Sequence, residues 1–171
     1  MKGYIQVYTG NGKGKTTAAL GLALRAAGAG LKVFFAQFIK GMEYSELHSI
    51  KKLSDNITLK QYGRECFIYK KPDDEDIKVA RNGFSEVSNI IAEGKHEIVV
   101  LDEINIAIYY KLISVDEVLE LINTKPENVE LVLTGRNVDE KIIERADLVT
   151  EMREIKHYYQ NGIHARKGIE S

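Results

Sequence analysis

The feature that most constrains the fold is a segment rich in glycine and lysine, Thr9–Thr17, which lies between an apolar run and an alanine-rich stretch. Its three glycines permit backbone conformations with positive φ, so that successive N–H groups can point toward one bound anion. A strand before the segment and a helix after it are the context that a phosphate-binding loop (P-loop) requires. The residues expected to contact the nucleotide here are Thr9, Gly10, Asn11, Gly12, Lys13, Gly14, Lys15, Thr16 and Thr17.

Two side chains of this loop have predicted roles of their own. Lys15 supplies a full positive charge near the distal phosphates, and the Thr16 hydroxyl can ligate Mg²⁺, which takes few protein ligands. Thr9 stands where the usual pattern has glycine, which indicates a loop geometry that departs from the ordinary one. The alternative is a glycine-rich turn that binds no ligand, and the strand–loop–helix context argues against it.

Short apolar runs alternate with helical patterns along the chain. Consecutive apolar residues such as Val99–Leu101 indicate strands that are covered on both faces. The sequence therefore predicts a single α/β domain over residues 1–171, with a mostly parallel sheet, helices on both faces and the architecture of P-loop NTPases of the RecA type. The expected strands are Tyr4–Tyr8, Lys32–Phe38, Ile57–Tyr62, Glu97–Asp102, Val129–Thr134 and Leu148–Arg153.

Helix signals lie between the expected strands. Helices are predicted over Thr17–Ala27 and Asp74–Glu93, and a third from a capping box at Ser114–Glu117 to Thr124. Asn137, with Glu140 three residues later, is a possible start of a further short helix. Residues 39–72 form the least regular stretch, and such stretches in compact domains are often functional.

Composition excludes some classes of protein. The formal net charge is -1, so no overall basic field draws in nucleic acid. Hydrophobic residues make up 44% and charged residues 29%, without an apolar run of the roughly 20 residues that span a bilayer. A single cysteine, Cys66, cannot form an intramolecular disulfide. We therefore expect a cytoplasmic protein without nucleic-acid or membrane partners.

A second candidate site follows the apolar run Ile98–Leu101, which ends in Asp102 and Glu103. Ligands of α/β proteins bind at the carboxyl ends of the strands, where a carboxylate can hold Mg²⁺ directly or through water. The alternative is a pair of solvated acids at a strand end. If water attacks the nucleotide, Glu103 would orient and deprotonate it, whereas for another nucleophile Glu103 would hold only the metal.

Blocks along nearly the whole chain are similar to one family. They are Tyr8–Ala19, Leu24–Ala26, Gln37–Gly41, Leu101–Glu103, Thr134–Arg136, Lys156–Tyr158, Gly162–Ile163 and Ala165–Glu170. The chain resembles the P-loop type of ATP:corrinoid adenosyltransferase (the CobA/CobO/BtuR type). The resemblance implies transfer of the 5′-deoxyadenosyl group of ATP to the cobalt(I) of a corrinoid, with release of inorganic triphosphate. It also implies ATP reversed along the loop, a homodimer, and a flavoprotein as reductant.

The resemblance also implies roles for particular residues. Lys15, Thr16 and Glu103 would be catalytic, with Thr16 and Glu103 holding Mg²⁺ and Asp102 in support. Arg25 and Arg136 would be further contacts to ATP. Because cobalt(I) attacks carbon with its own electron pair, no proton has to be removed and no general base is needed.

The corrinoid is expected at the irregular stretch. In the family, apolar aromatic side chains exclude the lower axial ligand of cobalt(II), and Phe67 and Tyr69 stand at the matching positions here. The family has tryptophan where this chain has Tyr69, and the chain contains no tryptophan. The alternative is an aromatic pair that packs a loop. Cys66 between these blocks is interpreted as a bystander thiol.

Two other functions remain open from the residues alone. A P-loop with nearby carboxylates also suits a hydrolytic ATPase or a small-molecule kinase. A nucleotide-gated binding protein, which holds ATP without turnover and signals through a moving loop, would carry the same motif.

Overall fold

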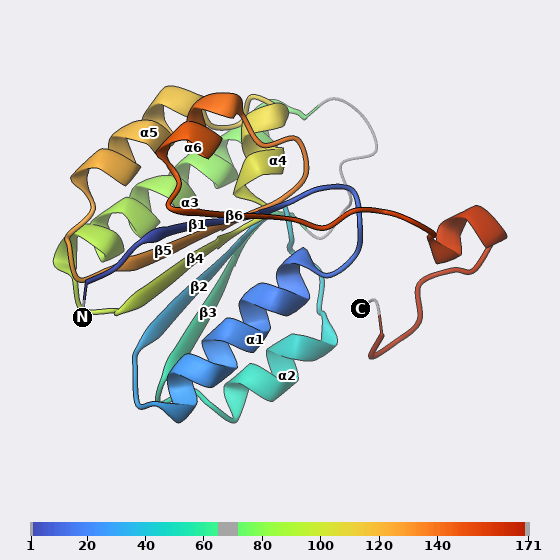
Figure 1. Cartoon of the computed structure of the whole chain (residues 1–171), viewed down its shortest axis with the longest axis horizontal. Coiled ribbons are helices and arrows are strands. Elements are labelled where there is room, and N and C mark those ends of the chain that lie inside the picture. The colour runs from blue at the N-terminus through green and yellow to red at the C-terminus, as the bar shows by residue number, and fades with distance from the viewer. Residues whose placement is uncertain (1, 65–71, 170–171) are drawn as a thin grey trace.

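The computed structural model describes residues 2–64 and 72–169, and its centre is a parallel β-sheet (Figure 1). Within the described ranges the sheet has six strands in the order β3-β2-β4-β5-β1-β6, and all neighbouring pairs are parallel. Each predicted strand is confirmed within two residues at either end. The strands are β1 Ile5–Thr9, β2 Val33–Phe38, β3 Ile57–Tyr62, β4 Ile98–Asp102, β5 Glu130–Thr134 and β6 Leu148–Glu151.

Helices cover both faces of the sheet, which confirms the predicted α/β class (Figure 1). Helices α1 (Lys15–Gly28) and α2 (Ser45–Lys51) lie on one face. The opposite face carries α3 (Asp74–Glu93), α4 (Ile104–Tyr109), α5 (Val115–Thr124) and α6 (Glu140–Arg145).

Strand β2 shows why consecutive apolar residues are needed. Phe34, Ala36 and Phe38 belong to the core under α3 and α5, whereas Val33 and Phe35 belong to the core under α1. Successive side chains of a strand point to opposite faces, so a strand between two helical layers is buried on both sides. All six residues of β2 are buried, as this packing requires.

Local signals set the start and end of α3 and the start of α5. The carboxylate of Asp73 accepts the backbone N–H of Asp76, and Gly94 ends α3 in the left-handed conformation. The acids at 73–76 therefore lie at the start of this helix. Ser114 and Glu117 form the predicted capping box of α5, which ends at Thr124 as expected.

Three features differ from the sequence expectations. Asn137 does not open α6, because it has a φ of 56° and lies outside the helix, which Asp139 caps through the N–H of Lys141. Helix α2 lies inside the stretch expected to be irregular. Helix α4 was not expected at all, since its six residues are too short for a periodic pattern.

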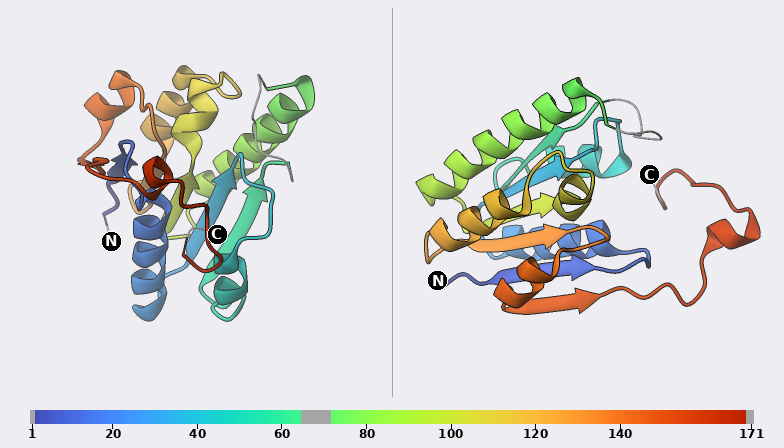
Figure 2. Two further views of the ribbon diagram at one scale, coloured as in Figure 1. Left: turned by 90° about the vertical axis from the view of Figure 1, so that its right-hand side faces the viewer. Right: turned by 90° about the horizontal axis from the view of Figure 1, so that it is seen from above.

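Beyond β6 the chain leaves the body of the domain. We call Met152–Ile169 the C-terminal arm; it contains a short 3₁₀ helix, Tyr158–Asn161, and projects past the carboxyl ends of the strands (Figure 2). Among the described residues, no helix has both the length and the apolar character needed to cross a membrane.

Candidate active site

The P-loop follows β1 at the carboxyl edge of the sheet. Gly10 and Gly14 have positive φ, at 92° and 123°. The N–H of Gly12 donates to the Met152 carbonyl at 2.7 Å, and the N–H of Met152 donates to the Thr9 carbonyl at 2.8 Å. A Cβ on Gly10 would lie 2.4 Å from the Met152 oxygen, so only glycine fits there. The loop is therefore held against the chain that follows β6.

Lys15 lies inside this loop. Its side chain is on the first turn of α1, the residue is only 8% exposed, and its Nζ donates to the carbonyls of Gly10 and Gly12 at 2.7 and 2.8 Å. Burial lowers the pKa of Lys15, and the nearby Arg136 adds to this effect, while Glu103 and Asp102 oppose it. A poorly solvated ammonium ion in a glycine loop is suited to bind phosphate oxygens.

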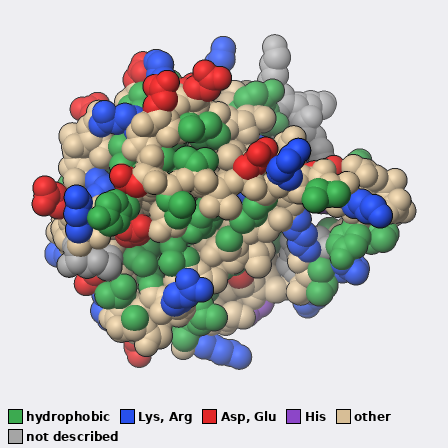
Figure 3. Space-filling view, in the orientation of Figure 1, with side chains coloured by type: hydrophobic (Ala, Val, Ile, Leu, Met, Phe, Trp, Pro, Cys, Tyr) green, Lys and Arg blue, Asp and Glu red, His purple; other side chains and the backbone are tan. Residues whose placement is uncertain are grey.

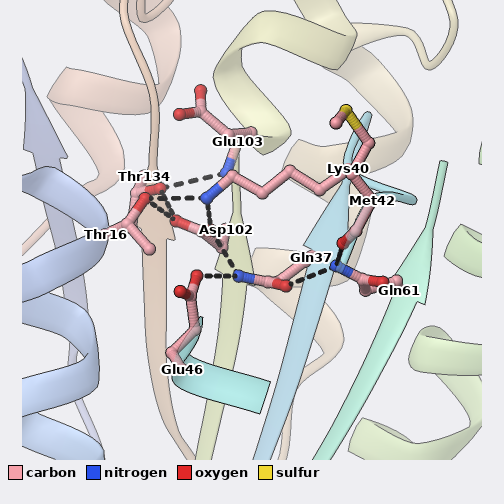
Figure 4. Close-up of polar contacts among 9 residues, drawn as sticks. All are labelled: Thr16, Gln37, Lys40, Met42, Glu46, Gln61, Asp102, Glu103 and Thr134. Carbon is pink, nitrogen blue, oxygen red and sulfur yellow. Dashed lines mark hydrogen bonds and ion pairs between the residues drawn. The ribbon is translucent and has the colours of Figure 1, made fainter. Parts of the chain in front are cut away.

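Asp102 lies at the end of β4 and is completely buried. Its Oδ1 accepts the hydroxyl of Thr16 at 2.9 Å and the hydroxyl of Thr134 at 2.6 Å (Figure 4). Thr134 in turn accepts the backbone N–H of Glu103 at 3.0 Å. The ends of β4 and β5 and the start of α1 therefore meet at one carboxylate. We call the group formed by Asp102, Thr16, Lys40 and Thr134 the Asp102 corner.

Lys40 is a member of this corner to which the sequence had assigned no role. Its Nζ lies 2.8 Å from Asp102 Oδ2 and 3.1 Å from Thr16 Oγ1. Burial by itself lowers the pKa of Lys40, but the attraction and hydrogen bond of Asp102, with Glu103 and Glu46, outweigh it and raise the pKa. The available signal was the position of Lys40 in the Gln37–Gly41 block, although local pattern cannot show where a long side chain ends.

Backbone geometry directs Lys40 toward Asp102. Ile39, directly before it, has a φ of 62°, which is rare for a β-branched residue. A Cβ on Gly63 would lie 2.5 Å from the Ile39 carbonyl carbon and the Lys40 nitrogen, so the two segments pack backbone to backbone. Glu103 is in the same left-handed region, with a φ of 61°. Strained residues that the surrounding structure maintains often lie at functional sites.

A further polar chain leads from the corner to α2. Gln37 is completely buried, and its amide nitrogen lies at 3.5 Å from Asp102 Oδ2 and 3.4 Å from Glu46 Oε1, both long contacts. Gln61 donates to the Gln37 amide oxygen at 3.1 Å (Figure 4). The amide of Gln37 is thereby fixed under Asp102.

Three further residues, Glu103, Arg136 and Arg25, were predicted to contact the nucleotide or the metal. The Glu103 carboxylate points away from Asp102 (Figure 4), and burial, followed by the charge of Asp102, raises its pKa. Arg136 follows β5, is exposed, and is close enough to influence both Lys15 and Glu103 electrostatically. Arg25 lies on α1 ten residues after Lys15, which is about 15 Å along the axis, so the structure does not bring it to the loop.

The expected corrinoid residues Phe67 and Tyr69, as well as Cys66, lie outside the described residues. A small hollow beside Arg64 encloses only about 10 Å³, which is room for about one water molecule. It therefore does not form a corrinoid pocket by itself. Its lining residues are Ile39, Tyr62, Gly63, Arg64, Asp76, Val79, Ala80 and Leu112.

The geometry supports binding of a polyphosphate beside a divalent cation, which is a common arrangement in P-loop proteins. Among solved structures, a KaiC-like protein from Pyrococcus horikoshii matches with a TM-score of 0.57 and 17% identity, covering 91% of this chain and 74% of that protein. At this identity the similarity supports the P-loop α/β fold alone.

Sequence comparisons identify the family. A family model described as ATP:corrinoid adenosyltransferase BtuR/CobO/CobP matches residues 1–171. Proteins named corrinoid adenosyltransferase are 40% identical in a Sinorhizobium species and 37% identical in Pseudomonas aeruginosa, each over 99% of this chain and over 80% and 84% of their own lengths. The protein of that name in Escherichia coli is 34% identical, over 99% of this chain and 86% of its own. The chain therefore belongs to the family of ATP:corrinoid adenosyltransferases.

Proposed function

We propose that this protein transfers the 5′-deoxyadenosyl group of ATP to the cobalt(I) of a corrinoid and releases inorganic triphosphate. The observation that carries the proposal is the buried Lys15 in a glycine loop beside the Thr16–Asp102 contact, in a chain of this family. These groups lie at the carboxyl edge of the sheet, where α/β proteins bind ligands.

The reaction requires charge stabilisation more than proton transfer. Cobalt(I) contributes an electron pair to the ribose C5′, and the bond from C5′ to the triphosphate oxygen breaks with its electrons on that oxygen. The N–H groups of the loop and the Lys15 ammonium would stabilise the negative charge of the departing triphosphate. Because no proton moves, Glu103 is not needed as a base.

The residues of the Asp102 corner fit Mg²⁺. Thr16 Oγ1 and Asp102 Oδ2 already hold a cation, the ammonium of Lys40, at 3.1 and 2.8 Å. Hydroxyl and carboxylate oxygens are ligands that Mg²⁺ prefers. When bound, Mg²⁺ neutralises charge on the triphosphate. In this proposal Thr16 and Asp102 hold the metal, and Glu103 has a supporting role. The resemblance implied the reverse for the two acids, with Glu103 as the ligand and Asp102 in support.

The corrinoid would lie beyond the carboxyl edge of the sheet, with Phe67 and Tyr69 excluding the lower axial ligand, by resemblance to the family. A flavoprotein reductant is likewise proposed from resemblance alone. A homodimer is supported by the C-terminal arm, whose side chains Ile155 and Tyr159 are 89% and 81% exposed. Large exposed apolar side chains on a projecting segment are typical of interfaces.

The test combines protein, Mg-ATP and chemically reduced cobalamin. We expect the absorbance spectrum of adenosylcobalamin to appear together with an equal amount of inorganic triphosphate. ADP formed without any corrinoid would instead support a hydrolytic ATPase or kinase. Tight ATP binding without consumption would support a nucleotide-gated binding protein.

A further inference from the structure

Lys40 lies where the proposed function requires the metal. Its ammonium contacts Asp102 Oδ2 at 2.8 Å and Thr16 Oγ1 at 3.1 Å, the two oxygens assigned above to Mg²⁺. Each contact is at hydrogen-bond distance, so the ammonium lies in the space between the hydroxyl and the carboxylate. An ammonium and a divalent cation cannot lie there at once.

The ammonium of Lys40 compensates the negative charge of Asp102. The carboxylate is completely buried, and the donors of Thr16 and Thr134 both reach Oδ1. Oδ2 receives the Lys40 ammonium and the long contact from Gln37. A buried carboxylate without a compensating charge strongly destabilises a fold, so Lys40 balances the charge of the corner.

The side chain of Lys40 can move although its backbone is fixed. The close packing of Gly63 against Ile39 and Lys40 holds the backbone. The side chain is 17% exposed, its Nζ lies 5.6 Å from the centre of the Tyr44 ring, and lysine has a flexible four-carbon stem. The ammonium can therefore leave Asp102 without any change in the strands.

A displaced ammonium needs another anion, and the loop is expected to supply one. Thr16 connects the two sites, because it is the residue after the loop lysine and its hydroxyl contacts both Lys40 and Asp102. A triphosphate bound by Lys15 would place oxygens next to this hydroxyl. The charge of Lys40 then stays compensated when Mg²⁺ takes its place.

We propose that Lys40 is a built-in counter-cation, which occupies the metal position before ATP binds and transfers to the triphosphate when Mg²⁺ enters with the nucleotide. This inference rests on the proposed function and adds a residue that couples metal and nucleotide binding. It implies that a divalent cation alone binds weakly, because it must displace the ammonium from its ion pair with Asp102 before a triphosphate is there to receive it. It also assigns Lys40, with Lys15, to the stabilisation of the leaving group.

The test uses the chain of residues 1–171, with Mn²⁺ as the metal probe. Without nucleotide, we expect Lys40→Met to bind Mn²⁺ about tenfold more tightly than the wild type, a change of the size usual for coupled binding sites. The affinity is measured by electron paramagnetic resonance titration. By calorimetry, with Mg²⁺ present, the same variant should bind inorganic triphosphate about tenfold more weakly. The control is Lys60→Met, which removes the same charge from an exposed pair with Glu86 and should leave both affinities unchanged.

A folded Lys40→Met variant with wild-type affinity for Mn²⁺ or for triphosphate would overturn the proposal. If that variant does not unfold cooperatively, Lys40→Gln keeps an N–H donor for Asp102 and is expected to show the same two changes. The wild type offers a measurement that depends on no variant. At saturating Mn²⁺ without nucleotide, modification of Lys40 by an amine reagent should become several-fold faster, and that of Lys60 should not change. An unchanged rate at Lys40 would count against displacement.

The outcomes also separate this inference from the proposed function. If the wild type makes adenosylcobalamin while the Lys40 variants bind metal and triphosphate as it does, only the role of Lys40 is rejected. If the wild type fails to bind Mg-ATP at all, both proposals are wrong.

Discussion

The Asp102 corner and the C-terminal arm lie at the same edge of the sheet, yet they are built in opposite ways. In the corner, Asp102 and Thr134 are completely buried and each polar group contacts others from different strands. In the arm, Ile155, Tyr159 and Ile169 are 89%, 81% and 56% exposed. Figure 3 shows hydrophobic and basic side chains together on the projecting arm. The contrast indicates that a single chain forms the phosphate end of the site, whereas the arm is suited to pack against something further.

The connection between the two regions is narrow. The arm begins at the backbone bonds that join Met152 to Thr9 and Gly12. Its far end returns to the loop, where Lys13 Nζ donates to the Ile169 carbonyl at 2.9 Å. A movement of the arm would therefore reach the loop through Gly12 and Lys13, while the buried corner would stay in place.

The largest expected effect comes from the loop lysine. Lys15→Ala removes the buried charge at the leaving group, and we expect kcat for adenosylcobalamin formation to fall about 10²–10³-fold. Lys60→Ala, with an exposed charge on the outer strand β3, is the matched control. Activity of Lys15→Ala within a few-fold of the wild type would contradict its assigned role.

The next largest effect is on stability of the corner. Thr134→Val removes a buried hydroxyl that joins Asp102 to the N–H of Glu103, and we expect the free energy of unfolding to fall by about 1–3 kcal/mol. Urea denaturation measures the change. Thr58→Val is the control, because Thr58 is exposed on β3 and its loss should change stability by less than about 0.5 kcal/mol. Equal losses of stability in Thr134→Val and Thr58→Val would mean that the buried hydroxyl of Thr134 contributes no more than an exposed one.

Removal of the C-terminal arm tests whether the arm is separate from the folded core. A chain that ends at Arg153 keeps the six strands that the structure describes, so we expect its free energy of unfolding to change by less than about 1 kcal/mol. Activity should be reduced, and so should the fraction of the proposed dimer, measured by light scattering. A strongly destabilised truncated protein would show that the arm belongs to the fold and is no separate surface.

The smallest effect concerns a histidine far from the corner. Burial lowers the pKa of His96 from its ordinary 6.5, and its ring packs edge to face on Phe34 with centroids 5.5 Å apart. Between the lowered folded pKa and the unfolded value, the unfolded chain binds more protons, so stability falls as the pH decreases below about 6.5. His96→Gln should lack this loss of stability at low pH. The loss is measured as the difference in urea midpoints between about pH 7.5 and about pH 5.5. A pH dependence identical to the wild type would exclude His96 as its source.

Local patterns were sufficient for the main elements. Val99–Leu101 and the other apolar runs predicted strands because a strand between two helical layers has no polar face. The glycine-rich sequence predicted a loop between β1 and α1, because the residues directly before it favour a strand and those directly after it favour a helix. Ser114 and Glu117 predicted the start of α5 because a capping box involves only four consecutive residues.

Contacts between distant segments were not visible in the same way. Lys40 lies 62 positions from Asp102 along the chain, and their ion pair depends on the order of β2 and β4 in the sheet and on the left-handed Ile39. Helices α2 and α4 are too short to show a period and form where the sheet offers a surface. The same argument applies to Arg25, for which the resemblance implied a contact to ATP, because only the helix places it about 15 Å along the axis from Lys15.

The sequence by itself determined that this chain is a parallel α/β protein with a P-loop, because those features depend on neighbouring residues and on the polarity of each strand. Only the tertiary structure decided which cation balances Asp102 and which acid is in contact with Thr16. Electrostatic partners are chosen by distance in space, and a distance of a few ångströms between residues far apart in the chain exists only after the strands have paired.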